Sequence, residues 1–182
     1  MDKIVENKYC ESPIFYMGNK YKLLKQIIPL FPDECDTFVD LFGGSGVVPM
    51  NYKGKKKTIY NEFNPNIVEL VKLFSGNSFE TLDSYIQSVV NKYNLLTGKK
   101  RNMFPSEEDF LKDINEKKER YNKFRTDYNS STAKDYKDLY ILSIFSCNHL
   151  IRFNKNDEFN ASFGSNGDYN ENLKRKIKNG CD

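Results

Sequence analysis

A short apolar segment that runs directly into three glycines is the feature that most constrains the fold of this chain. Residues 37–41 have the pattern of a buried strand, and Gly43, Gly44 and Gly46 follow before residues 47–52, which can form a helix. A strand, a glycine turn and a helix in this order let a small ligand approach bare backbone beside a helix N-terminus. The sequence therefore predicts an α/β unit with a ligand pocket at the glycine turn.

A carboxylate stands at the end of a second predicted strand. Residues 58–61 are expected to form this strand, and Glu62 follows it directly. A carboxylate about 20 residues beyond such glycines suits the hydroxyl pair of a ribose. Taken alone, Glu62 is equally consistent with a solvated strand end, but the glycines favour a nucleoside cofactor. A dinucleotide is the rival ligand, and it requires Gly-x-Gly-x-x-Gly, in which Pro49 here occupies the third position.

Composition narrows the class of protein. The 182 residues suit one domain, or one domain with a sizeable insertion, and 38% of them are hydrophobic, so a core can form. The four cysteines form no Cys-x-x-Cys pair, which argues against a zinc site or a disulfide framework and favours a reducing, cytoplasmic environment. The apolar runs are too short for a membrane span, and the polar N-terminus is no signal peptide. A net charge of +3 permits nucleic-acid binding without arguing for it.

The predicted elements divide the chain into three parts. Residues 1–75 have an α/β pattern that includes an amphipathic helix over residues 20–30 and a helix that starts at Asn64 and Pro65. The basic segment 53–57 is interpreted as a solvated loop between a helix and a strand.

Residues 76–167 form the helical second part, and residues 168–182 begin a return to the first part with a short basic helix over residues 169–178. The expected elements of the second part are helices capped by Ser78 and Ser106, a loop at residues 97–105, a buried helix at residues 135–145, and a β-hairpin of residues 150–154 and 158–163 around the turn 155–157.

Four motifs follow one another along the chain. They are Phe-Tyr-Met-Gly-Asn-Lys at residues 15–20, a Phe-x-Gly-x-Gly core within residues 38–46, Tyr-Asn-Glu at residues 60–62, and the hairpin segment 148–164. In this order they resemble the Dam-type (D12 class) adenine-specific DNA N6-methyltransferases of bacteria and phages. The resemblance implies an incomplete Rossmann-like core that binds S-adenosylmethionine, interrupted by a helical target-recognition insert with a β-hairpin. It also implies double-stranded DNA as the partner, a GATC-like site as the family default, and a role in DNA adenine methylation or restriction–modification.

The resemblance assigns roles to two sets of residues. Lys20 would hold the cofactor's carboxylate, Glu62 its ribose, and Asp40 would orient the glycine turn. The cofactor set is Tyr16, Lys20, Asp40, Phe42, Gly44, Gly46 and Glu62, and the DNA-binding set is Asn148, Leu150, Arg152, Asn154 and Asn160. Plainer alternatives remain open: core packing for Tyr16 and Phe42, and a surface or phosphate-contacting role for Arg152 in place of guanine reading. No metal ligands are assigned, and His149, the only histidine, is interpreted as a polar residue at a helix end.

A catalytic motif of the family is missing from the chain. Family members hold the adenine amino group with an Asp-Pro-Pro-Tyr type motif, whereas no two of the six prolines are adjacent here. The expectation is therefore a truncated enzyme with no catalytic residues that is inactive alone, and a C-terminal complementing chain is left open as a further partner. The alternatives are a non-catalytic DNA- or cofactor-binding remnant, one half of a split methyltransferase, or an unstable fragment. In the hairpin, Cys147 and Ser162 replace an aromatic residue and a proline of the family pattern.

Overall fold

The computed structural model describes residues 9–96 and 101–181 of the chain. Residues 1–8, residues 97–100 of the expected loop, and residue 182 lie outside the described part. Two β-strands and seven α-helices occur in the described part, which confirms the predicted α/β class. The chain divides into two compact units: the first holds the residues up to Asn77 and those from Asn172 onward, and the second is Ser78–Glu171.

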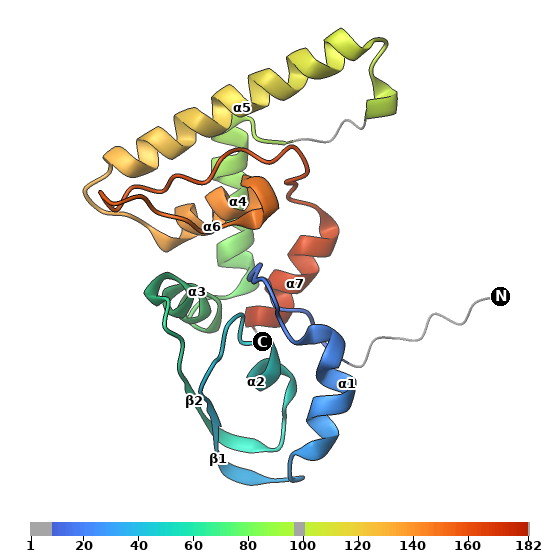
Figure 1. Cartoon of the computed structure of the whole chain (residues 1–182), viewed down its shortest axis with the longest axis vertical. Coiled ribbons are helices and arrows are strands. Elements are labelled where there is room, and N and C mark those ends of the chain that lie inside the picture. The colour runs from blue at the N-terminus through green and yellow to red at the C-terminus, as the bar shows by residue number, and fades with distance from the viewer. Residues whose placement is uncertain (1–8, 97–100, 182) are drawn as a thin grey trace, which may run out of the picture. The chain divides into compact units, whose positions relative to one another are not determined.

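The first unit contains a two-stranded parallel sheet (Figure 1). Strand β1 (Cys35–Asp40) pairs with strand β2 (Lys55–Tyr60), and Val39 lies opposite Ile59. Parallel strands require a crossover connection. The segment after the glycine turn supplies it with the short helix α2 (Val47–Asn51).

The basic segment 53–57 differs from its interpretation as a loop. Strand β2 begins at Lys55, so Lys55, Lys56 and Lys57 all belong to the sheet. Lys56 forms an exposed ion pair with Asp36 on β1, with 2.7 Å between Nζ and Oδ1. Lysine is disfavoured inside sheets but is common on edge strands, where its ammonium group stays in water. In the described part β2 pairs only with β1, so it is such an edge strand.

The helix expected over residues 20–30 forms as three short pieces. They are a 3₁₀ turn at Tyr21–Leu23, helix α1 at Leu24–Ile27, and a second 3₁₀ turn at Ile28–Leu30. Pro29 lies in the last piece and lacks the N–H that would continue the α-helical pattern. Phe31 is then extended, and its ring packs on those of Phe38 and Tyr52 at centroid distances of 5.2 and 5.1 Å. Because the helix ends here, Phe31 can pack against the sheet residue Phe38.

Two further helices belong to the first unit. Helix α3 (Pro65–Ser75) starts where the sequence predicts, and the side chain of Asn64 accepts a backbone N–H at 3.0 Å. Helix α7 (Glu171–Cys181) replaces the helix expected over residues 169–178 and continues through Gly180. Both helices bury an apolar stripe, which consists of Ile67, Leu70 and Phe74 on α3 and of Leu173 and Ile177 on α7.

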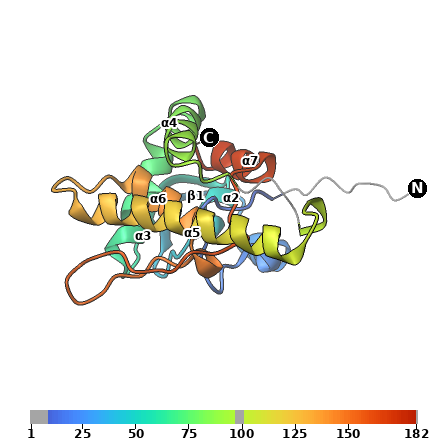
Figure 2. The same ribbon diagram turned by 90° about the horizontal axis from the view of Figure 1, so that it is seen from above.

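Three helices form the framework of the second unit (Figures 1 and 2). They are α4 (Phe79–Tyr93), α5 (Glu107–Ser130) and α6 (Tyr136–Phe145), and they pack against one another in pairs. The hydroxyls of Ser78 and Ser106 cap α4 and α5, as the sequence predicts. Every residue from 139 to 145 is buried, as expected for a nearly apolar helix. Short 3₁₀ turns occur at Arg101–Met103 and Cys147–His149.

Phenol–carboxylate hydrogen bonds join the helices of the second unit. Tyr85 on α4 donates to Asp138 on α6 at 3.0 Å, and Tyr93 on α4 donates to Asp127 on α5 at 2.8 Å. Both phenols are half-buried, and these bonds give their hydroxyls a partner within the protein. Across residues 9–96 and 101–181, no helix is both long and apolar enough to traverse a lipid bilayer.

Candidate functional site

The glycine turn after β1 has a backbone that only glycine adopts without strain. Gly44 and Gly46 have φ values of 51° and 70°, in the left-handed region. A Cβ on Gly44 would lie 3.3 Å from the ring of Tyr16, and a Cβ on Gly43 would lie 2.1 Å from the ring of Tyr60. The turn therefore leaves bare backbone between two aromatic rings.

The Glu62 carboxylate is fixed to this turn by backbone hydrogen bonds. Oε2 accepts the N–H of Gly44 at 2.9 Å, and Oε1 accepts the N–H of Asn64 at 3.0 Å. Tyr16 lies beside it. Burial raises the pKa of Tyr16, and the negative charge of Glu62 and a hydrogen bond to its carboxylate raise it further. A carboxylate can accept about four hydrogen bonds, so Glu62 retains acceptor capacity for a ligand's hydroxyl groups.

Asp40 marks the end of β1 beside the same carboxylate. Burial raises the pKa of Asp40, the charge of Glu62 raises it too, and a hydrogen bond from the backbone N–H of Phe42 opposes the shift. This backbone bond links Asp40 to the residue that precedes the glycine turn. Two carboxylates that face a half-buried site create a negative potential there. Such a site favours a ligand with hydroxyl or cationic groups.

Tyr60 and Asn61 were missed as site residues. The Tyr60 hydroxyl donates to the carbonyl of Gly44 at 2.5 Å, and the Asn61 side-chain amide donates to the carbonyl of Leu41 at 2.8 Å. Burial is the largest cause that raises the pKa of Tyr60, ahead of the charges of nearby carboxylates. The place of Tyr60 follows from the strand register, which pairs it with Asp40 beside the turn and which the sequence alone does not show.

The structure brings part of the predicted cofactor set together. Tyr16, Gly44 and Glu62 are in contact, Asp40 approaches them, and Gly46 precedes α2 as its N-cap. The Lys20 ammonium instead donates to the carbonyl of Gly18 at 2.7 Å on an exposed segment. The Phe42 side chain is 91% exposed, which rules out core packing for it in this structure.

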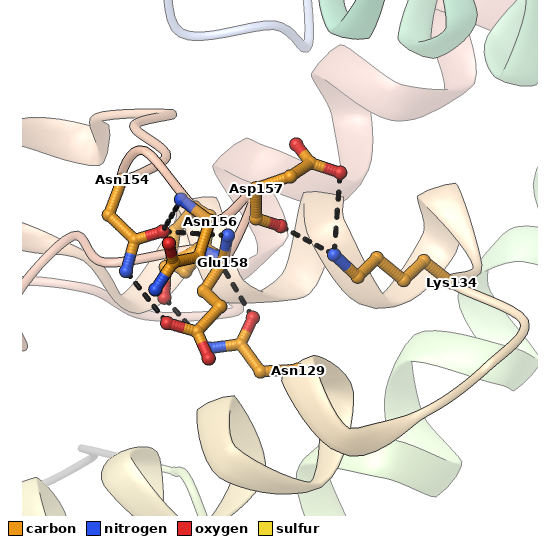
Figure 3. A network of polar contacts seen from close by, with 7 residues as sticks. Asn129, Lys134, Asn154, Asn156, Asp157 and Glu158 are labelled. Atoms are coloured by element: carbon orange, nitrogen blue, oxygen red, sulfur yellow. Dashed lines mark hydrogen bonds and ion pairs between the residues drawn. The ribbon is translucent and has the colours of Figure 1, made fainter.

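The predicted hairpin forms as a chain reversal with isolated bridges. Phe153 pairs with Phe159, and the backbone N–H of Asn154 donates to the carbonyl of Glu158 at 2.9 Å. The Asn154 side chain organises the turn, because its Oδ1 accepts the N–H groups of Asn156 and Glu158 at 2.9 and 3.0 Å (Figure 3). Side-chain bonds thus replace part of the strand ladder.

Helix α5 holds the second half of the hairpin through main-chain atoms. The Asn129 side chain accepts the N–H of Phe159 at 2.9 Å and donates to its carbonyl at 3.0 Å. Tyr121 and Arg125 both donate to the carbonyl of Ala161 at 3.1 Å. These three helix residues share one face at a spacing of four. That spacing was the only sequence signal of their role.

The predicted DNA-binding residues differ in their exposure and in their hydrogen-bond partners. Arg152 is exposed and bonds Asn160 across the hairpin, with 2.8 Å from Nε to Oδ1 and 3.0 Å from Nη2 to the backbone carbonyl. Asn148 is exposed with φ 53° on a short 3₁₀ turn. Leu150 is half-buried, and its carbonyl accepts the Ser146 hydroxyl at 3.0 Å.

The plain interpretation of His149 agrees with its geometry. Its Nδ1 lies 3.0 Å from the carbonyl of Ile144 in the last turn of α6. A histidine in this position satisfies a carbonyl that the helix end leaves without an intrahelical partner.

Comparison with known proteins identifies the family. Residues 16–179 match the family model of the D12 class N6 adenine-specific DNA methyltransferases, and the chain therefore belongs to this family. The modification methylase StsI of Streptococcus sanguinis is 39% identical over 173 residues, which cover 94% of this chain and 23% of that protein.

Two other relatives are similar. The type II methyltransferase M.FokI of Planomicrobium okeanokoites is 36% identical over 172 residues, which cover 94% of this chain and 23% of that protein. A DNA adenine methylase of Haemophilus influenzae is 26% identical over 152 residues, which cover 82% of this chain and 46% of that protein. The chain thus spans 23% of the length of the first two relatives.

Proposed function

We propose that this chain is the cofactor- and DNA-binding part of a site-specific DNA adenine N6-methyltransferase that uses S-adenosylmethionine. The observation that supports this most directly is the Glu62 carboxylate, which backbone N–H groups fix to the glycine turn with Tyr16 beside it. The parallel β1–β2 pair and its helical crossover would be one βαβ unit of a Rossmann-like core.

The residues at the turn fit a nucleoside cofactor. A Cβ at Gly44 would lie 3.3 Å from the Tyr16 ring on a backbone with φ 51°, so a larger residue there would strain the turn. We assign the ribose hydroxyls to Glu62, the bare backbone of Gly44 and Gly46 to the methionine moiety, and the exposed Lys20 ammonium to its carboxylate. S-adenosylmethionine supplies an electrophilic methyl group. The protein's part at this site is to bind and orient it.

The hairpin is the proposed reading element for double-stranded DNA. Arg152 is exposed on it and would contact a guanine through O6 and N7, within a GATC-like site. Asn148, Leu150, Asn154 and Asn160 complete the proposed surface, either in contact with DNA or as residues that shape the hairpin. Cys147 provides no aromatic wedge, so we expect weak DNA distortion and strongly salt-dependent binding.

The residues that polarise the adenine are proposed to come from a polypeptide segment outside these 182 residues. None of the six prolines is adjacent to another, so the chain has no Asp-Pro-Pro-Tyr type motif. Exposed apolar side chains support this proposal: on the sheet the paired Val39 and Ile59 are 48% and 45% exposed, and Phe63, beyond the end of β2, is fully exposed. Parallel sheets are normally covered on both faces. A complementing segment would cover this one.

Binding of the cofactor tests the first half of the proposal. Titration calorimetry with S-adenosylmethionine should give a one-site isotherm, and NAD at the same concentrations should give none. Binding of NAD in preference would replace the proposal with the dinucleotide alternative.

Methyl transfer tests the second half. The purified chain should transfer no methyl group to DNA, and a polypeptide that supplies the Asp-Pro-Pro-Tyr motif and the remaining strands should restore transfer. Val39→Lys on the open sheet face should block this restoration but leave cofactor binding unchanged. Robust N6-methyladenine formation by the chain alone would contradict the assignment. If the chain bound S-adenosylmethionine and DNA but no added polypeptide restored methyl transfer, the chain would be a non-catalytic remnant.

A further inference from the structure

The guanidinium of Arg152 is held by a single residue across the hairpin. Nε donates to Oδ1 of Asn160 at 2.8 Å, and Nη2 donates to the backbone carbonyl of Asn160 at 3.0 Å. The backbone N–H of Asn160 donates in turn to the carbonyl of Arg152 at 2.9 Å. A guanidinium has donors only, so the atom that Asn160 presents to Nε has to be its oxygen.

The contact with Asn160 uses one edge of the Arg152 guanidinium, and a second edge takes no part in it. Arginine has five N–H donors in a planar fork. Asn160 takes the Nε hydrogen and one Nη2 hydrogen, so the edge formed by Nη1 and the second Nη2 hydrogen does not take part. Two parallel donors of this kind match guanine O6 and N7. Because Arg152 is exposed, that edge can face a ligand.

Asn160 is itself fixed by its two neighbours. Phe159 and Ala161 are 1% and 2% exposed, and their main-chain atoms bond Asn129 and Tyr121 of α5. The hairpin position that orients Arg152 is therefore anchored to a long helix.

We propose that Asn160 is a positioning residue that sets base preference by orienting Arg152 and does not itself read a base. This inference rests on the proposed function of the hairpin in DNA reading. Without Asn160, the Arg152 side chain is free to reach phosphates as well as a base edge. Phosphate contacts bind all sequences alike. Loss of Asn160 should therefore reduce discrimination more than overall affinity.

The test is a binding competition at fixed salt. The probes are a duplex that the wild-type chain selects from a randomised pool and every single-base variant of it. Arg152→Ala should lose about 5- to 150-fold of preference at one base pair. Asn160→Ala should lose preference at the same base pair, and it should add nothing in the Arg152→Ala background. Asn156→Ala is the matched control, because this turn asparagine contributes its backbone N–H to the network of Figure 3, and it should keep the wild-type preference.

A conservative variant and a measurement without DNA separate positioning from folding. Asn160→Asp keeps a side-chain acceptor, so it should retain the preference at a lower overall affinity. In ¹⁵N spectra the Arg152 Nε–H should exchange slowly in the wild type and rapidly in Asn160→Ala, with the backbone amide spectrum otherwise preserved.

Three results would overturn the inference. They are an unchanged Nε–H exchange rate in Asn160→Ala, an unchanged base preference in that variant, and an equal loss of affinity for every duplex. If the wild-type chain shows no base preference at all, the proposed DNA-reading function fails, and the Nε–H exchange still decides whether Asn160 orients Arg152.

Discussion

Replacement of Glu62 by glutamine, its nearest isostere, should impair cofactor binding even though the shape of the side chain is preserved. Both carboxylate oxygens accept backbone N–H groups, one from Gly44 and one from Asn64. A glutamine has one acceptor oxygen and one NH₂ group, which is a donor. In Glu62→Gln one of the two backbone N–H groups therefore faces another donor, and the turn cannot keep its geometry.

The expected loss of binding has two parts. The free variant can relax its turn, whereas the bound state needs the turn in its native geometry, in which a half-buried N–H without an acceptor costs about 1–2 kcal/mol. The ribose hydroxyls lose a charged acceptor and retain at best a neutral one, which costs about 1 kcal/mol more. The sum, about 2–3 kcal/mol, corresponds to a dissociation constant raised by roughly 30- to 160-fold.

Titration calorimetry with S-adenosylmethionine measures this effect for the wild type, Glu62→Gln and Glu62→Ala. Glu69→Gln removes the same charge from an exposed ion pair on α3 and is the matched control, which should bind as the wild type does. If Glu62→Gln bound the cofactor within about threefold of the wild type, the backbone-acceptor role and the ribose role of this carboxylate would both be refuted.

Three other changes have defined outcomes. Gly43→Ala should destabilise the chain by about 1–3 kcal/mol in denaturant unfolding, because the new Cβ would overlap the Tyr60 ring, which its hydroxyl bond holds in place. An unchanged unfolding midpoint would show that the ring moves freely. Burial raises the pKa of Asp40 above its usual 3.8, so the folded state binds more protons than the unfolded state and its stability falls as the pH rises from about 4. Asp40→Asn should flatten this dependence of stability on pH in thermal melts at a series of pH values. An equal dependence in the variant would show that Asp40 is not its cause. Asn129→Ala should leave the main chain of buried Phe159 unpaired, cost about 1–3 kcal/mol, and accelerate hydrogen exchange of the Phe159 amide, whereas unchanged protection would contradict the anchoring role.

Local signals in the sequence predicted those elements whose structure depends on near neighbours. Asn64, Ser78 and Ser106 begin helices because each side chain caps the N–H groups that follow it. The glycine turn after β1 was recognisable because left-handed backbone requires glycine. The helix over residues 135–145 was recognisable because an apolar segment of that length has to be buried.

Tertiary context decided the features that the sequence did not reveal. Three lysines begin β2 because pairing with β1 outweighs their weak strand preference. Tyr60 closes on the glycine turn only because the strand register places it opposite Asp40. In the hairpin, hydrogen bonds from α5 side chains replace part of the strand-to-strand ladder. The alternation of apolar and polar residues along residues 150–163 contains no information about a partner helix.

The clamp that α5 places on the hairpin has a consequence for how specificity could evolve. Asn129, Tyr121 and Arg125 bond only main-chain atoms of Phe159 and Ala161, and every amino acid offers the same carbonyl. The identity of the outward residue between them is therefore not fixed by the clamp. Under the proposed DNA-reading function, variants at Arg152 and Asn160 would alter the sequence that is read while the scaffold stays in place, so a change of target need not pass through a misfolded intermediate.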